Sequence, residues 1–147
     1  MKKIVFMGTP LFAVPILKSI FQKGYEIPLV YTQPPSKSNR GYKLSKSPIQ
    51  IFCEENNLSI RTPENFNKIE DEKKVLEKIE ADMALVVAYG QILPESILNV
   101  CKKGFINIHA SLLPKLRGAA PIQRSIMNLD NETGVSIMQI NEKLDQG

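Results

Sequence analysis

One stretch of the sequence decides the fold: Met83-Ala84-Leu85-Val86-Val87-Ala88. These six apolar residues have the length of a strand buried on both faces, which is typical of the centre of a parallel sheet. A charged stretch with helical periodicity, Asn67 to Glu80, precedes the strand, and a short predicted helix, Pro94 to Val100, follows it. A strand between two helices indicates parallel pairing, because crossover connections between parallel strands are usually helical.

The alternation of strands and helices continues in both directions along the chain. Strands are predicted at Lys3–Met7, Ile27–Thr32, Leu58–Arg61, Phe105–His109 and Val135–Ile140. Helices are predicted at residues 10–24 with an irregular start at Pro15, at 48–57 with Ser47 as the cap, and at 121–127. The sequence therefore predicts an α/β fold, with an open, mostly parallel twisted sheet and helices on both of its faces.

Length and composition narrow the class of protein. The chain has 147 residues, about one domain, with 43% hydrophobic and 23% charged residues, as in ordinary globular proteins. No apolar run approaches the roughly 18 residues of a membrane-spanning helix. Cys53 and Cys101 match no metal-ligand spacing, so we interpret them as reduced, semi-buried residues of a cytoplasmic protein.

The positive charge is concentrated near the N-terminus. Residues 1–47 contain eight Lys or Arg and one acid, a net charge of +7, whereas residues 48–147 contain eleven bases and fourteen acids, a net charge of −3. Four of the bases recur at every third position of the predicted loop Gln33–Ser47, namely Lys37, Arg40, Lys43 and Lys46. This loop is either a solvated, flexible basic segment or a contact for a polyanionic partner.

The carboxyl ends of the predicted strands are the places to look for a ligand site, because open α/β sheets bind ligands there. The residues at those ends are Gly8-Thr9-Pro10, Tyr89-Gly90 and Asn107 to Gly118. The first of these does not match the G-x-G-x-x-G pattern, and Pro10 removes a backbone donor that a pyrophosphate would need. NAD and ATP are therefore not favoured as ligands.

Asn107 and His109 are the candidate catalytic residues. They lie two positions apart at the end of a predicted strand, so their side chains share one face. An imidazole there can act as a general acid near neutral pH, and an amide can donate to a developing oxyanion. The alternative is a strand-end pair that is hydrogen-bonded to a neighbouring loop. His109 is the only histidine, so no metal site is predicted.

The sequence around these two residues is similar to a known family signature. Residues 107–114, NIHASLLP, resemble the signature of the folate-dependent formyltransferases. The likeness covers essentially the entire chain, with further matching stretches at residues 6–15, 32–34, 86–94, 115–124, 132–139 and 144–147. The resemblance implies a Rossmann-like formyltransferase fold and the transfer of a formyl group from 10-formyltetrahydrofolate to an amine, without a metal.

The resemblance also implies roles for individual residues. Asn107 matches the asparagine that stabilises the tetrahedral oxyanion, His109 the histidine that assists proton movement, and Asp145 the aspartate that positions this histidine. Eight residues match positions assigned to folate binding: Val87, Ala88, Tyr89, Gly90, Ser111, Leu112, Leu113 and Pro114. The Leu113–Pro114 peptide bond is expected to be cis.

Residues 115–124 resemble one branch of the family, whose members formylate the α-amino group of methionine on initiator tRNA. The basic loop matches an insertion that contacts the acceptor end of the tRNA, with Arg40 as the best candidate among Arg40, Lys43, Lys37 and Lys46. Four loop positions depart from the family pattern, namely Pro35, Lys37, Asn39 and Tyr42. Initiator methionyl-tRNA and the folate co-substrate are the expected partners of a monomeric protein with no membrane partner.

Two alternatives stay open. A sister enzyme would formylate a small amine, such as glycinamide ribonucleotide or an amino sugar nucleotide, whereas a catalytically inactive fragment would only bind folate or RNA. The resemblance also implies that residues 1–147 are a catalytic domain that is incomplete at its C-terminus, and that a C-terminal β-barrel domain for tRNA binding is absent.

Overall fold

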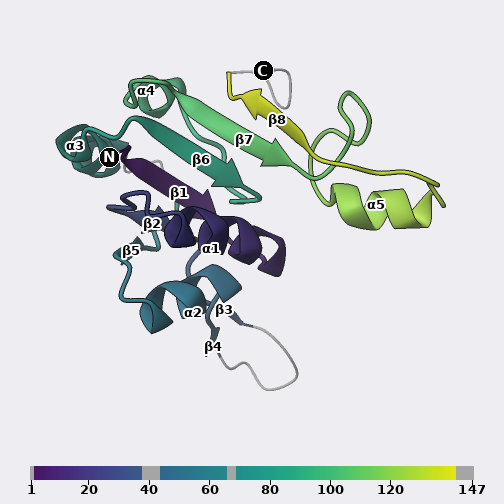
Figure 1. Ribbon diagram of the computed structural model, residues 1–147, viewed down its shortest axis with the longest axis horizontal. Coiled ribbons are helices and arrows are strands. Elements are labelled where there is room, and N and C mark those ends of the chain that lie inside the picture. Colours follow the sequence, from purple (N-terminus) through teal and green to yellow (C-terminus); the bar gives the residue numbers. More distant parts are fainter. Residues whose placement is uncertain (1, 38–43, 66–68, 142–147) are drawn as a thin grey trace.

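A six-stranded sheet forms the centre of the computed structural model, which describes residues 2–37, 44–65 and 69–141. The strand order is β5 (Ile60–Arg61), β2 (Val30–Tyr31), β1 (Ile4–Gly8), β6 (Met83–Val87), β7 (Phe105–His109) and β8 (Ser136–Gln139). The first five strands pair in parallel, and β8 pairs antiparallel to β7 (Figure 1). The mostly parallel sheet predicted from the sequence is confirmed.

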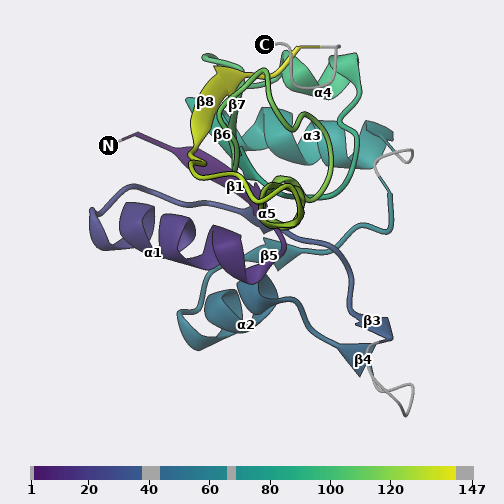
Figure 2. The same cartoon turned by 90° about the vertical axis from the view of Figure 1, so that its right-hand side faces the viewer.

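Helices cover both faces of the sheet, as predicted (Figure 2). One face is covered by α1 (Val14–Gln22) and α2 (Pro48–Glu55), and the other by α3 (Ile69–Ile79) and α4 (Glu95–Leu98).

Successive side chains of β1 point to opposite faces of the sheet. Phe6 packs in the apolar cluster with α1 and α2, whereas Val5 and Met7 pack in the cluster with α3 and α4. All three side chains are fully buried. Burial on both faces explains why β1 has a continuous apolar sequence instead of an alternating one.

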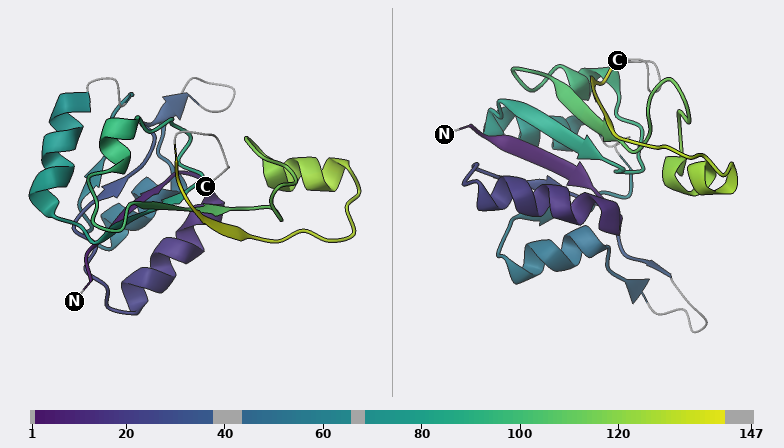
Figure 3. Two further views of the ribbon diagram at one scale, coloured as in Figure 1. Left: turned by 90° about the horizontal axis from the view of Figure 1, so that it is seen from above. Right: turned by 45° about the vertical axis from the view of Figure 1, so that its right-hand side comes forward.

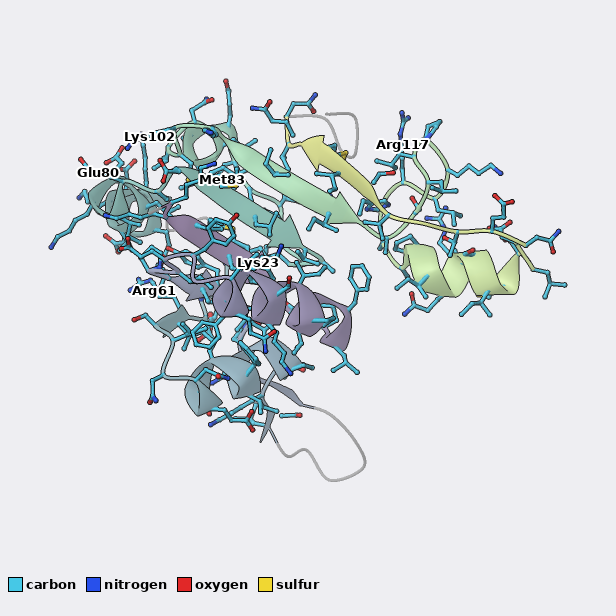
Figure 4. All side chains as sticks on the ribbon, viewed as in Figure 1. Lys23, Arg61, Glu80, Met83, Lys102 and Arg117 are labelled. Atoms are coloured by element: carbon cyan, nitrogen blue, oxygen red, sulfur yellow. The ribbon has the colours of Figure 1, made fainter. Side chains whose placement is uncertain are left out.

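The strand order reverses between β1 and β6. From β1 the chain adds β2 and β5 on one side, and then crosses to the other side and adds β6, β7 and β8. Gly8 pairs with Val87, so the segments that follow β1 and β6 emerge side by side. Ligands of open α/β sheets bind at such a point. In Figure 4, Met83 and Lys102 mark the opposite, amino edge of the sheet, and Arg117 follows the carboxyl end of β7.

The strand β2 and the basic loop differ from the prediction. The predicted strand Ile27–Thr32 forms a ladder over only two residues, because Pro28 has no N–H to donate. The predicted loop 33–47 contains a short antiparallel hairpin with β3 (Ser36–Lys37) and β4 (Leu44–Ser45) as its arms. The hairpin lies beside α2 and projects away from the sheet (Figures 1 and 2).

The helix starts follow the local sequence signals. Ser47 caps α2 as predicted, and its Oγ accepts a hydrogen bond from the backbone N–H of Gln50 at 3.0 Å. A 3-10 turn, η1 (Leu11–Ala13), precedes α1, and Pro15 lies in the first turn of that helix. No helix in the described ranges is long and apolar enough to cross a membrane.

Cys53 and Cys101 are both free cysteines and are more deeply buried than predicted. Each thiol lies in one of the two apolar clusters on either side of the sheet. Burial raises the pKa of the Cys53 thiol to about 12 and that of the Cys101 thiol to about 11. The prediction of semi-buried residues was wrong, because both are neutral side chains of the core.

The helix α5 (Pro121–Met127) has the bounds predicted from the sequence and lies beyond the carboxyl end of β7 (Figures 1 and 3). Its apolar residues Ile126 and Met127 are 69% and 80% exposed. The described residues therefore leave this side of α5 uncovered.

Candidate active site

Asn107 and His109 lie at the carboxyl end of β7, close to the point where the strand order reverses. Asn107 pairs with Val86 of β6, so it lies beside the segment predicted to bind folate. Asn107 is half-buried, and His109 is 8% exposed. The structure thus places both predicted catalytic residues at the edge of the sheet where a ligand is expected.

The ring of His109 is oriented by the loop that follows β7. Its Nε2 lies 2.9 Å from the backbone carbonyl oxygen of Leu116. A carbonyl oxygen only accepts hydrogen bonds, so Nε2 must carry the proton in this contact. Leu116 adopts a φ of 55°, an uncommon left-handed conformation for a residue other than glycine. This contact corresponds to the Nε2–H tautomer of the neutral ring.

The predicted folate-binding loop, residues 111–114, is fastened to β8 by Ser136. The Ser136 Oγ accepts a hydrogen bond from the Leu113 N–H at 3.0 Å and donates one to the Ser111 carbonyl at 2.8 Å. The Leu113–Pro114 peptide bond is cis, as the resemblance implied. Sequence reasoning gave Ser136 no role, since its place opposite His109 depends on the antiparallel register of β8.

The four residues of this loop differ in how far their side chains are exposed to solvent. The Ser111 side chain is fully buried, and its hydroxyl donates to the Lys115 carbonyl at 2.7 Å. Leu112 is 47% exposed, and Pro114 is exposed as well. Ser111 therefore shapes the loop, whereas the side chains of Leu112 and Pro114 are accessible to a ligand.

The second predicted folate-binding segment, residues 87–90, alternates buried and exposed residues. The side chains of Val87 and Tyr89 are buried in the two apolar clusters. Ala88 and Gly90 have φ values of 47° and 85°, and both residues are exposed. Ala88 and Gly90 are therefore the residues of this segment that a ligand can reach.

A hollow of about 450 Å³ lies between these strand ends and the base of the hairpin. Its lining includes Thr9, Gln33, Lys46, Ser47 and Gly90. The Lys46 ammonium is exposed and forms an ion pair with Glu54 at 2.7 Å. This hydrogen bond and a second one from Gln50 hold the pKa of the Glu54 carboxyl below its usual value. An exposed pair of this kind is weak, so a phosphate can compete for Lys46.

Several predicted site residues lie outside the described part of the chain: Arg40, Lys43 and Asp145. The side chain of Lys37 is likewise not described. Within the described ranges, no group of three or more His, Cys, Asp or Glu side chains could hold a metal ion.

A buried carboxylate that sequence reasoning missed, Glu72, ties α3 to the sheet. Its Oε2 accepts a hydrogen bond from the Tyr31 hydroxyl at 2.7 Å, and its two oxygens accept from Arg61 at 2.9 and 2.7 Å. Burial alone would raise the pKa of Glu72, but the hydrogen bonds from Arg61 and Tyr31 outweigh it and lower the pKa. The signal in the sequence is the helical spacing of Glu72 and Leu76, which puts both on the core face.

The switch point of the sheet and the polar end of β7 together define a candidate ligand site at the carboxyl edge of an α/β fold. All 147 residues match a family model described as "Formyl transferase". The chain therefore belongs to the formyl transferase family, as the resemblance in its sequence implied.

Relatives with assigned names are similar over nearly the whole chain. The chain is 65% identical over 146 residues to a methionyl-tRNA formyltransferase of Pelagibacter ubique (strain HTCC1062), covering 99% of this chain and 47% of that protein. It is 47% identical over 145 residues to a methionyl-tRNA formyltransferase of Sphingopyxis alaskensis, covering 99% of this chain and 47% of that protein. The chain thus spans about half the length of the curated relatives it matches.

Solved structures support the fold. The crystal structure of phosphoribosylglycinamide formyltransferase from Bacillus halodurans superposes with a TM-score of 0.76 at 19% identity, covering 99% of this chain and 75% of that one. At this identity the likeness shows the fold alone, and the Rossmann-like formyltransferase fold predicted from the sequence is confirmed.

Proposed function

We propose that the protein transfers the formyl group of 10-formyltetrahydrofolate to the α-amino group of methionine on initiator tRNA. The product, formylmethionyl-tRNA, would serve translation initiation in the cytoplasm. The observation that carries the proposal is the 65% identity, over nearly the whole chain, to a relative named methionyl-tRNA formyltransferase. Asn107 and His109, at the end of β7, are the two side chains proposed to act in this reaction.

The chemistry assigned to the site is an attack of the amine nitrogen on the formyl carbon. The carbonyl oxygen becomes an oxyanion in the tetrahedral intermediate, and the Asn107 amide is proposed to donate a hydrogen bond to it. The bond between this carbon and N10 of the folate then breaks. The amine loses one proton and N10 gains one, so tetrahydrofolate leaves as a neutral amine.

His109 is proposed to carry that proton. The contact of its Nε2–H with the Leu116 carbonyl holds the ring at the end of β7, where the proton would be transferred. Asp145 is proposed to stabilise the charged form of the ring, because a nearby carboxylate favours an imidazolium. Neither step calls for a metal ion.

The folate is proposed to lie along the strand ends. The exposure of Ala88 and Gly90 supports a role of this segment in contacting the edge of the pterin, and Leu112 and Pro114 offer apolar contact. Ser111 and Leu113 are proposed to act by shaping this loop, since their polar backbone and side-chain groups bond to Lys115 and Ser136.

The acceptor end of the tRNA is proposed to contact the basic hairpin through Arg40, Lys43, Lys37 and Lys46. Lys46 would exchange its exposed pairing with Glu54 for a phosphate. The small-amine alternative is less well supported, since the solved small-amine relative shares 19% identity. We propose that the active protein is a monomer.

Incubation of the full chain with 10-formyltetrahydrofolate and methionyl-tRNA tests the proposal, with mass analysis of the esterified amino acid as the readout. A gain of one formyl group on the methionine is expected. Parallel incubations with glycinamide ribonucleotide and a folate-binding titration complete the test. Formylation of glycinamide ribonucleotide alone would replace the proposal by the small-amine alternative, and folate binding without any turnover would replace it by the inactive-fragment alternative.

A further inference from the structure

Hydrogen bonds join the carboxyl ends of three strands at the point where the strand order reverses. The Thr9 hydroxyl, just beyond β1, donates to the Tyr89 carbonyl, beyond β6, at 2.8 Å. The same Thr9 oxygen accepts from the backbone N–H of Gln33, beyond β2, at 3.3 Å. The third hydrogen bond comes from the Gln33 side chain, whose Nε2 donates to the Gly90 carbonyl at 2.8 Å. Gln33 thus contacts the ends of both β1 and β6.

The backbone conformation of Gly90 and its lack of a side chain leave room for the Gln33 amide. Its φ of 85° lies in the left-handed region, which glycine adopts most readily. A Cβ at this position would lie only 2.6 Å from the Gln33 Nε2. The absence of a side chain at residue 90 is therefore what allows the amide of Gln33 to approach.

Gln33 also lies at the base of the hairpin. Thr32, the residue before it, has its hydroxyl 2.7 Å from the hydroxyl of Ser47, and both side chains are buried. Ser47 in turn caps α2. The hydrogen bond between Thr32 and Ser47 therefore holds the two ends of the hairpin segment together at its base. Gln33 connects this base to Gly90 beyond the end of β6.

We propose that Gln33 is a positioning residue that fixes the hairpin base relative to residues 88–90. This inference rests on the proposed function, in which the hairpin contacts tRNA and the strand end contacts the folate. One side chain then sets the spacing of the two substrate sites, although it touches neither the formyl group nor the amine.

The sharpest test is Gln33→Glu in the full chain, because glutamate keeps the size of glutamine but has no N–H₂ to donate. Its carboxylate would face the Gly90 carbonyl. The expected result is a rise in KM of about 3- to 10-fold for both methionyl-tRNA and 10-formyltetrahydrofolate, with kcat changed less than about twofold. Gln33→Ala is expected to act in the same direction. Gln22→Glu, on the exposed end of α1, is the matched control and should leave both KM values unchanged.

A merely structural role would lower the thermal midpoint and leave both KM values as in the wild type, and that result would overturn the inference. So would a rise in only one of the two KM values.

Hydrogen exchange supplies a second readout that needs no substrate. In Gln33→Glu, the amides of residues 88–92 and those of Ser36 and Lys37 are expected to exchange faster together, and unchanged exchange would contradict the inference. If the wild type forms no formylmethionyl-tRNA, the proposed function fails, and the exchange data still decide the role of Gln33.

Discussion

The Nε2 atom of His109 lies 2.9 Å from the carbonyl oxygen of Leu116, and this contact determines which nitrogen of the ring carries the proton. The contact matters for the proposed chemistry because it fixes the orientation of the imidazole ring at the end of β7. Leu116 can present its carbonyl in this way because its backbone turns through the left-handed region.

The neutral ring of His109 is therefore expected to be the Nε2–H tautomer. His109 is the only histidine of the chain, so its two ring nitrogens give unambiguous signals in nitrogen-15 NMR. The measurement is a long-range proton–nitrogen correlation at a pH where the ring is neutral. A spectrum in which Nδ1 carries the proton would contradict the assignment.

Removal of the imidazole is expected to stop turnover without unfolding the protein. His109→Gln keeps an N–H that can donate to Leu116 but cannot take up a proton, so kcat should fall by about 100-fold or more. Asn99→Ala, an exposed position after α4, is the control. A rate for His109→Gln within a few-fold of the wild type would show that another group moves the proton.

Arg40→Ala is expected to weaken the use of tRNA more than the use of folate. The loss of one phosphate contact should raise the KM for methionyl-tRNA and reduce the slope of its salt dependence by about one, with the folate KM unchanged. Lys74→Ala removes the same charge from an exposed position of α3 and should change neither KM. If the two variants had the same KM for methionyl-tRNA and the same salt dependence, Arg40 would not contact the tRNA.

Glu72 is expected to make the stability depend on acid pH. Its pKa is lower in the folded state, so its contribution to stability is complete above its usual value of 4.5 and is lost as the pH falls through the folded pKa. Glu72→Gln should cost about 1–2 kcal/mol near pH 7 and less at pH 3, as measured by urea unfolding. A difference between the proteins that does not shrink on acidification would contradict this account.

The sequence predicts the parts of this fold that depend on local pattern. The continuous apolar strands, the bounds of β7 and α5, and the Ser47 cap each follow from a few neighbouring residues. The strand β2 is shorter than its apolar sequence predicts, because Pro28 has no N–H to donate to a neighbouring strand.

The candidate site was predictable in position but not in its contacts. Asn107 and His109 stand out as polar residues at a strand end, whereas the roles of Leu116, Ser136 and Gln33 depend on register and on left-handed turns. Glu72 was missed although its spacing from Leu76 puts it on the core face of α3, because glutamate is rarely buried in proteins.

The most direct test of the central claim is a competition between two acceptors in one reaction. The full chain receives limiting 10-formyltetrahydrofolate together with methionyl-tRNA and glycinamide ribonucleotide, and the formyl group is counted on each product. We expect formyl transfer to methionyl-tRNA with a far higher kcat/KM than to glycinamide ribonucleotide. Transfer mainly to glycinamide ribonucleotide, or to neither acceptor, would contradict it.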